Sequence, residues 1–354
     1  MLLQKSLIGN SRAGKEQFEE VVRSRRMANN QERMHAQVMR ANGEMVVNDG
    51  SIPRDVYQEF DNVTVERMRL DDGDTFLNDL LPLSRSVSIG KLVSKFRQAS
   101  DAGRAQTSMS GQIGVKMDQV EFTYDGSIIP IHDTGFGRNW REWNAQTSGG
   151  FDALVDDQRE SIATLRHKLV DNFLDGHTDA QGNYLVVDAI SWQGVRNDSR
   201  VIQVDLGAGG VNFDFTDTAQ TYAAIESNFK EVRDTALITN KCNKALTYYV
   251  SLEIASNLER NSSESYSSEK IMNRLAQLIG VAEIKASSKL SGNEFMAFPL
   301  DSSVIRPVVG MGLNTVAMPR PVYNSNYDFA VWGAIGYEIR TDYFGNSCAL
   351  FAQA

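Results

Sequence analysis

The chain has 354 residues, of which 42% are apolar and 23% charged, and its formal net charge is −9. This composition is typical of a folded soluble protein, and the length allows two or three compact units. The acidic balance argues against a general nucleic-acid coat and against a protein that binds anionic membranes.

Residues 1–50 are predicted to form an N-terminal arm. Residues 1–40 carry a net charge of +4, whereas the remainder carries −13. Apolar residues between Lys15 and Arg40 are too sparse for a helix that is stable alone. A basic arm on an acidic body can contact nucleic acid or an acidic partner, and Arg23, Arg25 and Arg26 are the candidate contacts in this arm. The alternative is an ordinary solvated helix.

The arm contains a near match to a phosphate-binding loop in "LIGNSRAGKE", with Gly9, Gly14 and Lys15. Such a loop needs Ser or Thr after the lysine to ligate magnesium, and it follows a buried strand. Glu16 occupies the hydroxyl position, and its charge would repel phosphate. A soluble nucleotide-binding enzyme is therefore only a distant alternative.

Residues 51–85 are predicted to lead into the folded body, after a turn cluster at residues 48–55. The acidic stretch "LDDGDTF" at residues 70–76 lacks the alternating ligands and the distal Glu of a helix-loop-helix calcium site. It is interpreted as a surface turn before a helix.

Residues 86–148 are predicted to hold an extended loop. Strand-like runs at 115–124 and 127–131 flank Asp125 and Gly126, and Asp-Gly between such runs predicts a hairpin turn with positive φ at the glycine. We expect this hairpin to project and to pack on a neighbouring subunit. Trp140, Arg141 and Trp143 are candidate interface anchors, with a local Arg–Trp stack as the alternative.

A long helix is the clearest prediction, over residues 151–175. Apolar residues recur at helical spacing, acidic residues occupy the first turns, and Gly176 ends the segment. Its length suits a strut.

The rest of the chain is predicted to alternate strands and helices. Short strands are expected within 184–215, a helix over 217–235 capped by Asp217, and a strand that runs into a helix within 245–260. A helix over 268–279 and strands near 282–285, 295–298 and 304–309 follow. Two final strands are expected to be joined by a turn at 342–345.

No catalytic, cofactor or metal constellation is found. The four histidines lack zinc spacing, and no nucleophile elbow is present. Cys242 and Cys348 are predicted to be reduced, buried residues of a protein from a reducing compartment. No secretion signal or membrane span is predicted. We therefore expect no enzyme and a protein made in a cytoplasm.

The order of elements resembles that of the major capsid proteins of tailed phages. This is the Johnson fold of the Hong Kong ninety-seven type, which encapsulins share. The textual likeness lies in "GSIIPIHDTGFGRNWREW" before the long helix, and in the succession "FPLD", "IRPVVG", "YDF" and "YEIRTDYFGNSCAL" near the C-terminus. It covers most of residues 85–354.

The resemblance implies an α+β fold and a division of labour. Residues 1–50 would be the arm, 51–85 the lead-in to the peripheral domain, and 86–148 the extended loop. Residues 149–236 would be the spine helix and peripheral domain, 237–315 the axial domain, and 316–354 strands that return to the peripheral domain. Some family members cross-link a loop lysine to an asparagine; Lys116 would be the lysine and Asn324, Asn326 or Asn346 its partner, although non-covalent packing is favoured.

The resemblance also implies a function. Copies would assemble as hexamers and pentamers into an icosahedral virion shell around double-stranded DNA in the host cytoplasm. Portal and scaffolding proteins, and a possible decoration protein, would be the other partners. An encapsulin-type compartment is the alternative.

Overall fold

We describe a computed structural model of the chain. It describes residues 74–354 apart from 104, 111–113, 115–116, 143–152, 180, 263–268 and 323, together with scattered helical positions between residues 23 and 34. The chain divides into two units, residues 1–65 and 66–354. The near match to a phosphate-binding loop lies outside the described residues.

A four-stranded sheet forms one half of this unit. Its order is β1 (Arg85–Ser86), β11 (Ile305–Ala317), β12 (Tyr327–Ile339) and β4 (Ile131–Arg138). The long strands β11 and β12 are antiparallel, β4 is antiparallel to β12, and β1 is parallel to β11. The strand β11 is longer than the predicted segment 304–309, because its pairing with β12 continues through two register shifts.

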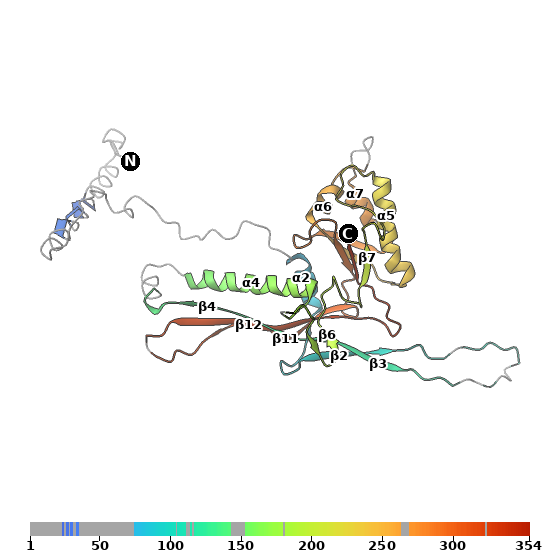
Figure 1. Cartoon of the computed structure of the whole chain (residues 1–354), viewed down its shortest axis with the longest axis horizontal. Coiled ribbons are helices and arrows are strands. Elements are labelled where there is room, and N and C mark those ends of the chain that lie inside the picture. The colour runs from blue at the N-terminus through green and yellow to red at the C-terminus, as the bar shows by residue number, and fades with distance from the viewer. Residues whose placement is uncertain are drawn as a thin grey trace, which may run out of the picture. The chain divides into compact units, whose positions relative to one another are not determined.

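The helix α4 (Ala153–Asp175) runs along β4 and β12, which confirms the predicted long helix (Figure 1). Its second half is buried through Leu165, Leu169, Val170, Phe173 and Leu174. Gly176 has φ of +73°, a conformation that glycine adopts without steric cost at the end of a helix. Arg138 on β4 forms a 2.6 Å ion pair with Asp157 of α4.

A five-stranded sheet forms the other half. Its order is β7 (Ile202–Asp205), β13 (Leu350–Gln353), β10 (Phe295–Phe298), β8 (Leu246–Val250) and β9 (Val281–Ala286). The helices α5 (Tyr222–Asp234), α6 (Leu252–Leu258) and α7 (Ile271–Ala276) cover it, with a π-helical turn η4 (Thr235–Thr239) after α5 (Figure 1).

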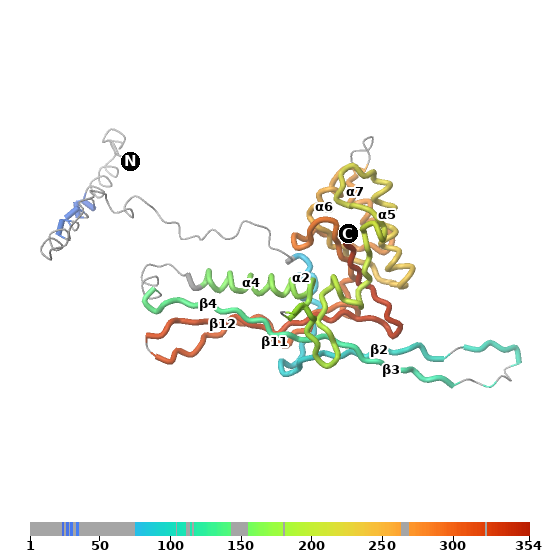
Figure 2. Tube along the Cα trace, in the orientation of Figure 1, coloured from blue at the N-terminus to red at the C-terminus, as the bar shows by residue number. Residues whose placement is uncertain are grey.

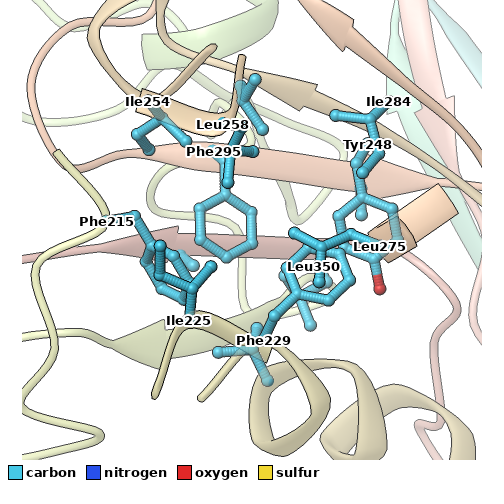
Figure 3. Packing of buried hydrophobic residues seen from close by; sticks show 14 of the residues in the cluster. Phe215, Ile225, Phe229, Tyr248, Ile254, Leu258, Leu275, Ile284, Phe295 and Leu350 are labelled. Atoms are coloured by element: carbon cyan, nitrogen blue, oxygen red, sulfur yellow. The ribbon is translucent and has the colours of Figure 1, made fainter. Parts of the chain in front are cut away.

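Every residue of the central strands β8 and β10 is buried. On one face, Phe295 and Tyr248 pack with Phe229 of α5 (Figure 3). On the other face, Phe298 packs with Phe173 of α4. The helix α2 (Asp74–Leu80) contributes buried side chains to the same cluster, and a short 3-10 turn η3 (Leu81–Leu83) follows it. Alternate side chains of one strand thus enter two cores.

The last strands differ from the expected arrangement. The turn at 342–345 is present, with Gly345 donating its backbone N–H to Asp342 and φ of +84°. The strands that it separates do not pair with each other: β12 belongs to the four-stranded sheet and β13 to the five-stranded one. Residues 316–354 are therefore divided between both sheets.

The helix α5 begins later than predicted. Its N-cap is Thr221, whose hydroxyl accepts from the backbone N–H of Ala224, and the prediction of Asp217 as cap was wrong. Asp217 instead accepts from the N–H of Ala219 in the preceding turn. Both side chains can cap, and only the path of the chain selects between them.

The two cysteines form a disulfide, which corrects the prediction that both are reduced. Cys242 lies before β8 and Cys348 before β13, with 5.4 Å between their Cα atoms. The prediction failed because 106 residues separate them in sequence, and only the sheet brings them together.

Candidate assembly surface

The candidate surface lies on a two-stranded ribbon. The strand β2 (Val93–Ala99) pairs antiparallel with β3 (Phe122–Ile128), from Val93 opposite Ile128 to Ala99 opposite Phe122. The two strands leave the four-stranded sheet side by side (Figure 2). A two-stranded ribbon has no second layer, so one of its faces remains open.

The open face of the ribbon carries Arg97, Ala99, Phe122 and Tyr124, which we call the ribbon outer face. Directly opposed residues in an antiparallel pair share a face, and the register places Arg97 opposite Tyr124. Phe122 is 48% exposed and Tyr124 68% exposed. The Arg97 guanidinium lies 4.5 Å from the Phe122 ring centroid. Exposed aromatic and arginine side chains are typical of residues that anchor protein interfaces.

The opposite face of the ribbon is fixed to the body by buried charge. The Glu338 carboxylate on β12 is fully buried, accepts from the Ser94 hydroxyl at 3.1 Å, and pairs with Arg340 at 2.6 Å. Arg306 on β11 pairs with the same carboxylate at 2.9 Å. Burial lowers the pKa of Arg306, and the attraction of Glu338 opposes that shift. A buried carboxylate held by two guanidinium groups and a hydroxyl fixes the ribbon in one orientation.

A second anchor holds β3 at Asp125 and Gly126. Arg200 forms a 2.6 Å ion pair with the buried Asp198 and donates to the Gly126 carbonyl at 2.8 Å. The Asp125 carboxylate lies 3.7 Å from the same guanidinium. Burial alone would lower the pKa of Arg200, but the hydrogen bonds that its guanidinium donates to Asp198 and the charges of nearby carboxylates outweigh burial, so the pKa of Arg200 is raised.

Asp125 and Gly126 lie inside the continuous strand β3 and form no turn, so the predicted hairpin turn at this dipeptide was wrong. Gly126 is absent from the described residues with positive φ. A glycine is required at position 126 for another reason: an added Cβ would lie 2.4 Å from the Ser94 carbonyl oxygen and 2.9 Å from the Ile190 side chain. Ile190 belongs to β6 (Ile190–Ser191), a short strand that pairs with β5 (Val186–Val187). The true hairpin connection lies between Ala99 and Phe122.

Besides the ribbon outer face, the four-stranded sheet offers an open face of its own, on the side away from α4. Asp133 and Trp332 lie opposite each other in the pairing of β4 with β12, so their side chains share one face of the sheet. The adjacent residue His132 contacts Asn172 of α4, and because side chains alternate along a strand, Asp133 and Trp332 face away from the helix. A shallow depression here is lined by Ile131, Asp133, Val316, Ala317, Met318, Pro319, Ala330 and Trp332. Several of these apolar side chains are exposed, as on the ribbon outer face.

The other predicted interface residues fall in different places. Trp140 is half-buried, and the exposed Arg141 lies 5.8 Å from its ring, which fits the local stack that was the alternative. Lys116 and Trp143 lie outside the described residues. Of the candidate cross-link partners, Asn346 donates its amide to Asp342, while Asn324 and Asn326 are exposed.

In the arm, Arg23 and Arg26 are exposed helical residues, and Arg25 lies outside the described positions. Sequence reasoning missed the anchors Glu338, Arg306 and Arg200. Glu338 and Arg200 contact ribbon residues that lie far away in sequence, Arg306 pairs with Glu338, and no local motif marks any of the three.

The described residues hold no group of three His, Cys, Asp or Glu side chains that could bind a metal ion. Within the same part of the chain, no helix is both long enough and apolar enough to cross a membrane.

The chain belongs to DUF6260, a family of unknown function, whose model matches residues 42–352. No curated protein matches the sequence. Among solved structures, the capsid of Myoviridae phage XM1 matches with a TM-score of 0.62 at 11% identity, over 86% of this chain and 99% of its own. The capsid of a native GTA particle matches with a TM-score of 0.56 at 10% identity, over 87% of this chain and 99% of its own.

A structure from Mycobacterium phage Ogopogo matches with a TM-score of 0.54 at 10% identity, over 85% of this chain and 99% of its own. Likeness at these identities shows the fold. The chain has the Hong Kong ninety-seven type capsid fold, which confirms the fold class predicted from the sequence. The phage XM1 and GTA structures that share this fold are capsids.

Proposed function

We propose that this member of DUF6260 is the major capsid protein of a tailed phage. Copies assemble as hexamers and pentamers into an icosahedral shell that encloses double-stranded DNA. The observation that carries the proposal is the capsid fold, matched over most of the chain, with a ribbon that exposes aromatic side chains. A monomer gains nothing from exposing Phe122 and Tyr124, whereas a neighbouring copy can bury them.

The two sheets suggest the division of labour. We assign α4 and the four-stranded sheet to the peripheral domain, and the five-stranded sheet with α5, α6 and α7 to the axial domain. The boundaries then differ from those drawn on the sequence, since β7, α5 and β13 join the axial domain. The ribbon and the residues between its strands are the extended loop.

The remaining partners follow from the same proposal. Portal and scaffolding proteins, and a possible decoration protein, would meet the shell, and packaged DNA would be contacted without sequence specificity. Arg23, Arg25 and Arg26 of the basic arm are the proposed contacts to DNA or scaffold. Replacing all three by Glu should reduce the yield of filled particles; normal yields would remove this role from the arm.

The first experiment is the mass of the purified protein by light scattering, with electron micrographs of the same fraction. Megadalton shells, or rings of five or six subunits, would support the proposal. A monomer under assembly-permitting conditions would contradict it. The contents of isolated native particles then decide between the alternatives: DNA supports a phage capsid, and a cargo enzyme supports an encapsulin-type compartment.

The ribbon offers a more specific test. Gly126→Val places a side chain against the backbone of β2, so we expect the base of the ribbon to shift and shells to fail. Gly312→Val is the matched control in β11, because nothing lies within 4 Å of an added Cβ there. Normal shells from Gly126→Val would show that the ribbon base does not direct assembly.

A further inference from the structure

A small cavity lies where the ribbon joins the body, and both polar and apolar side chains line it. The elements that meet there are β3, α4, β12 and the segment that leads from β6 to Arg200. The volume of the cavity is about 20 Å³. A cavity needs roughly 10–15 Å³ by this measure to hold one water molecule.

Three buried polar atoms without a hydrogen-bond partner line this cavity. They are the Ser127 hydroxyl on β3, the Asn172 side-chain oxygen on α4 and the Tyr337 hydroxyl on β12. Ser127 and Asn172 are each 3% exposed. Leaving any such group unsatisfied away from water is costly, so three together at one cavity call for a ligand.

The state of Asn172 identifies what the ligand must supply. The side-chain amide nitrogen of Asn172 lies 3.3 Å from the Nδ1 atom of His132. Because an amide nitrogen can only donate, Nδ1 of His132 is the acceptor in this pair. The Asn172 oxygen is therefore left as a pure acceptor. Burial raises the pKa of Tyr337, which keeps its phenol protonated and able to donate. The ligand must donate to the asparagine, accept from the tyrosine and bond a serine hydroxyl.

We infer that the cavity holds one structural water molecule, bonded to Ser127, Asn172 and Tyr337. Water both donates and accepts, fits the volume, and finds here the number of partners that buried waters usually have. It joins the base of the ribbon to the spine helix and to the long strand β12. The charged groups of Glu338 and Arg200 bond the ribbon at Ser94 and Gly126. The water adds a contact between uncharged side chains, which links Ser127 of the ribbon to Asn172 and Tyr337 of the body.

The direct test is a structure of the subunit or of its assembled form, at a resolution that shows ordered water. We expect a density peak within hydrogen-bond distance of all three atoms. An empty cavity, or side chains rotated to bond one another, would overturn the inference. The test does not depend on whether the protein forms a shell.

Thermal unfolding offers a second test with a matched control. Tyr337→Phe removes one partner of the water, and we expect the melting temperature to fall by roughly 2–4 °C. Tyr248 also has a buried, unpaired hydroxyl, but it lies in the apolar cluster of the five-stranded sheet (Figure 3). Tyr248→Phe should leave the melting temperature unchanged or raise it.

Variants at the other partners sharpen the result. The double variant Ser127→Ala and Tyr337→Phe should cost less than the sum of the single variants, because both act through one molecule. If Tyr337→Phe behaves like Tyr248→Phe and the single effects add, no water connects the two residues.

Discussion

The five-stranded sheet and the β2–β3 ribbon are both built from β-strands, but they bury their side chains in opposite ways. In the sheet, β8 and β10 are buried throughout and send alternate side chains into two cores. In the ribbon, only the base is buried, and Phe122 and Tyr124 face outward. The sheet buries its side chains within one chain, whereas the ribbon leaves aromatic side chains exposed, which the proposed neighbouring copy would cover.

Truncation of the sheet core should have the largest effect on stability. Phe295 is 1% exposed and contacts the rings of Phe215, Phe229 and Tyr248. Phe295→Ala should lower the free energy of unfolding by about 3–5 kcal/mol, because it removes apolar burial and leaves a cavity. Denaturant unfolding of the purified subunit measures this, and a loss below 1 kcal/mol would contradict the assigned core.

Loss of the disulfide should have the next largest effect. Cys348→Ser opens a link that closes a long loop between β8 and β13, and its removal should cost about 2–5 kcal/mol under oxidising conditions. The matched control is the unchanged protein with reductant, which should unfold like the variant. If reductant does not change unfolding of the unchanged protein, the two thiols are not joined in solution.

Acidification should have a smaller effect on stability, acting through His132 on β4, where it contacts Asn172 of α4. Burial lowers the pKa of His132 below its ordinary value of 6.5. The backbone hydrogen bond with Ile335 and the charge of Asp133 oppose this shift, and Lys168 and His177 reinforce it. The unfolded chain then binds a proton at a pH where the folded chain does not, so stability falls as pH drops below 6.5. His132→Gln should remove part of this slope, and chemical denaturation at several pH values measures it. An identical slope in the variant would show that other groups set the pH dependence.

Changes on the ribbon outer face should have the smallest effect on stability and a large one on assembly. Phe122→Ser with Tyr124→Ser removes exposed apolar groups, so the free energy of unfolding should change by less than about 0.5 kcal/mol. Shell formation should fall strongly if a neighbouring copy covers this face. Thr123→Ser, on the other face of β3, is the control. Normal shells from the double variant would place the subunit interface elsewhere.

Local patterns in the sequence were sufficient to predict the elements whose conformation depends on residues close to them in the sequence. The apolar spacing between Leu165 and Leu174 and the stop at Gly176 predict α4, because helix periodicity and a glycine cap act within a few residues. The strand at 295–298 was predicted with its bounds for a similar reason: four consecutive apolar residues suit a strand buried on both faces. The order of such elements also pointed to the capsid fold.

Only the tertiary structure decided which elements meet. Asp-Gly predicts a turn locally, but the pairing of β3 with β2 holds Asp125 and Gly126 in an extended strand. Cys242 finds Cys348, and Glu338 finds Ser94, across 106 and 244 residues of sequence. Such contacts leave no periodic or local signal, because the free energy that forms them comes from sheet pairing and burial that no short stretch contains. The helix and the buried strands could therefore be predicted, while the anchors and the water cavity that fix the ribbon could not.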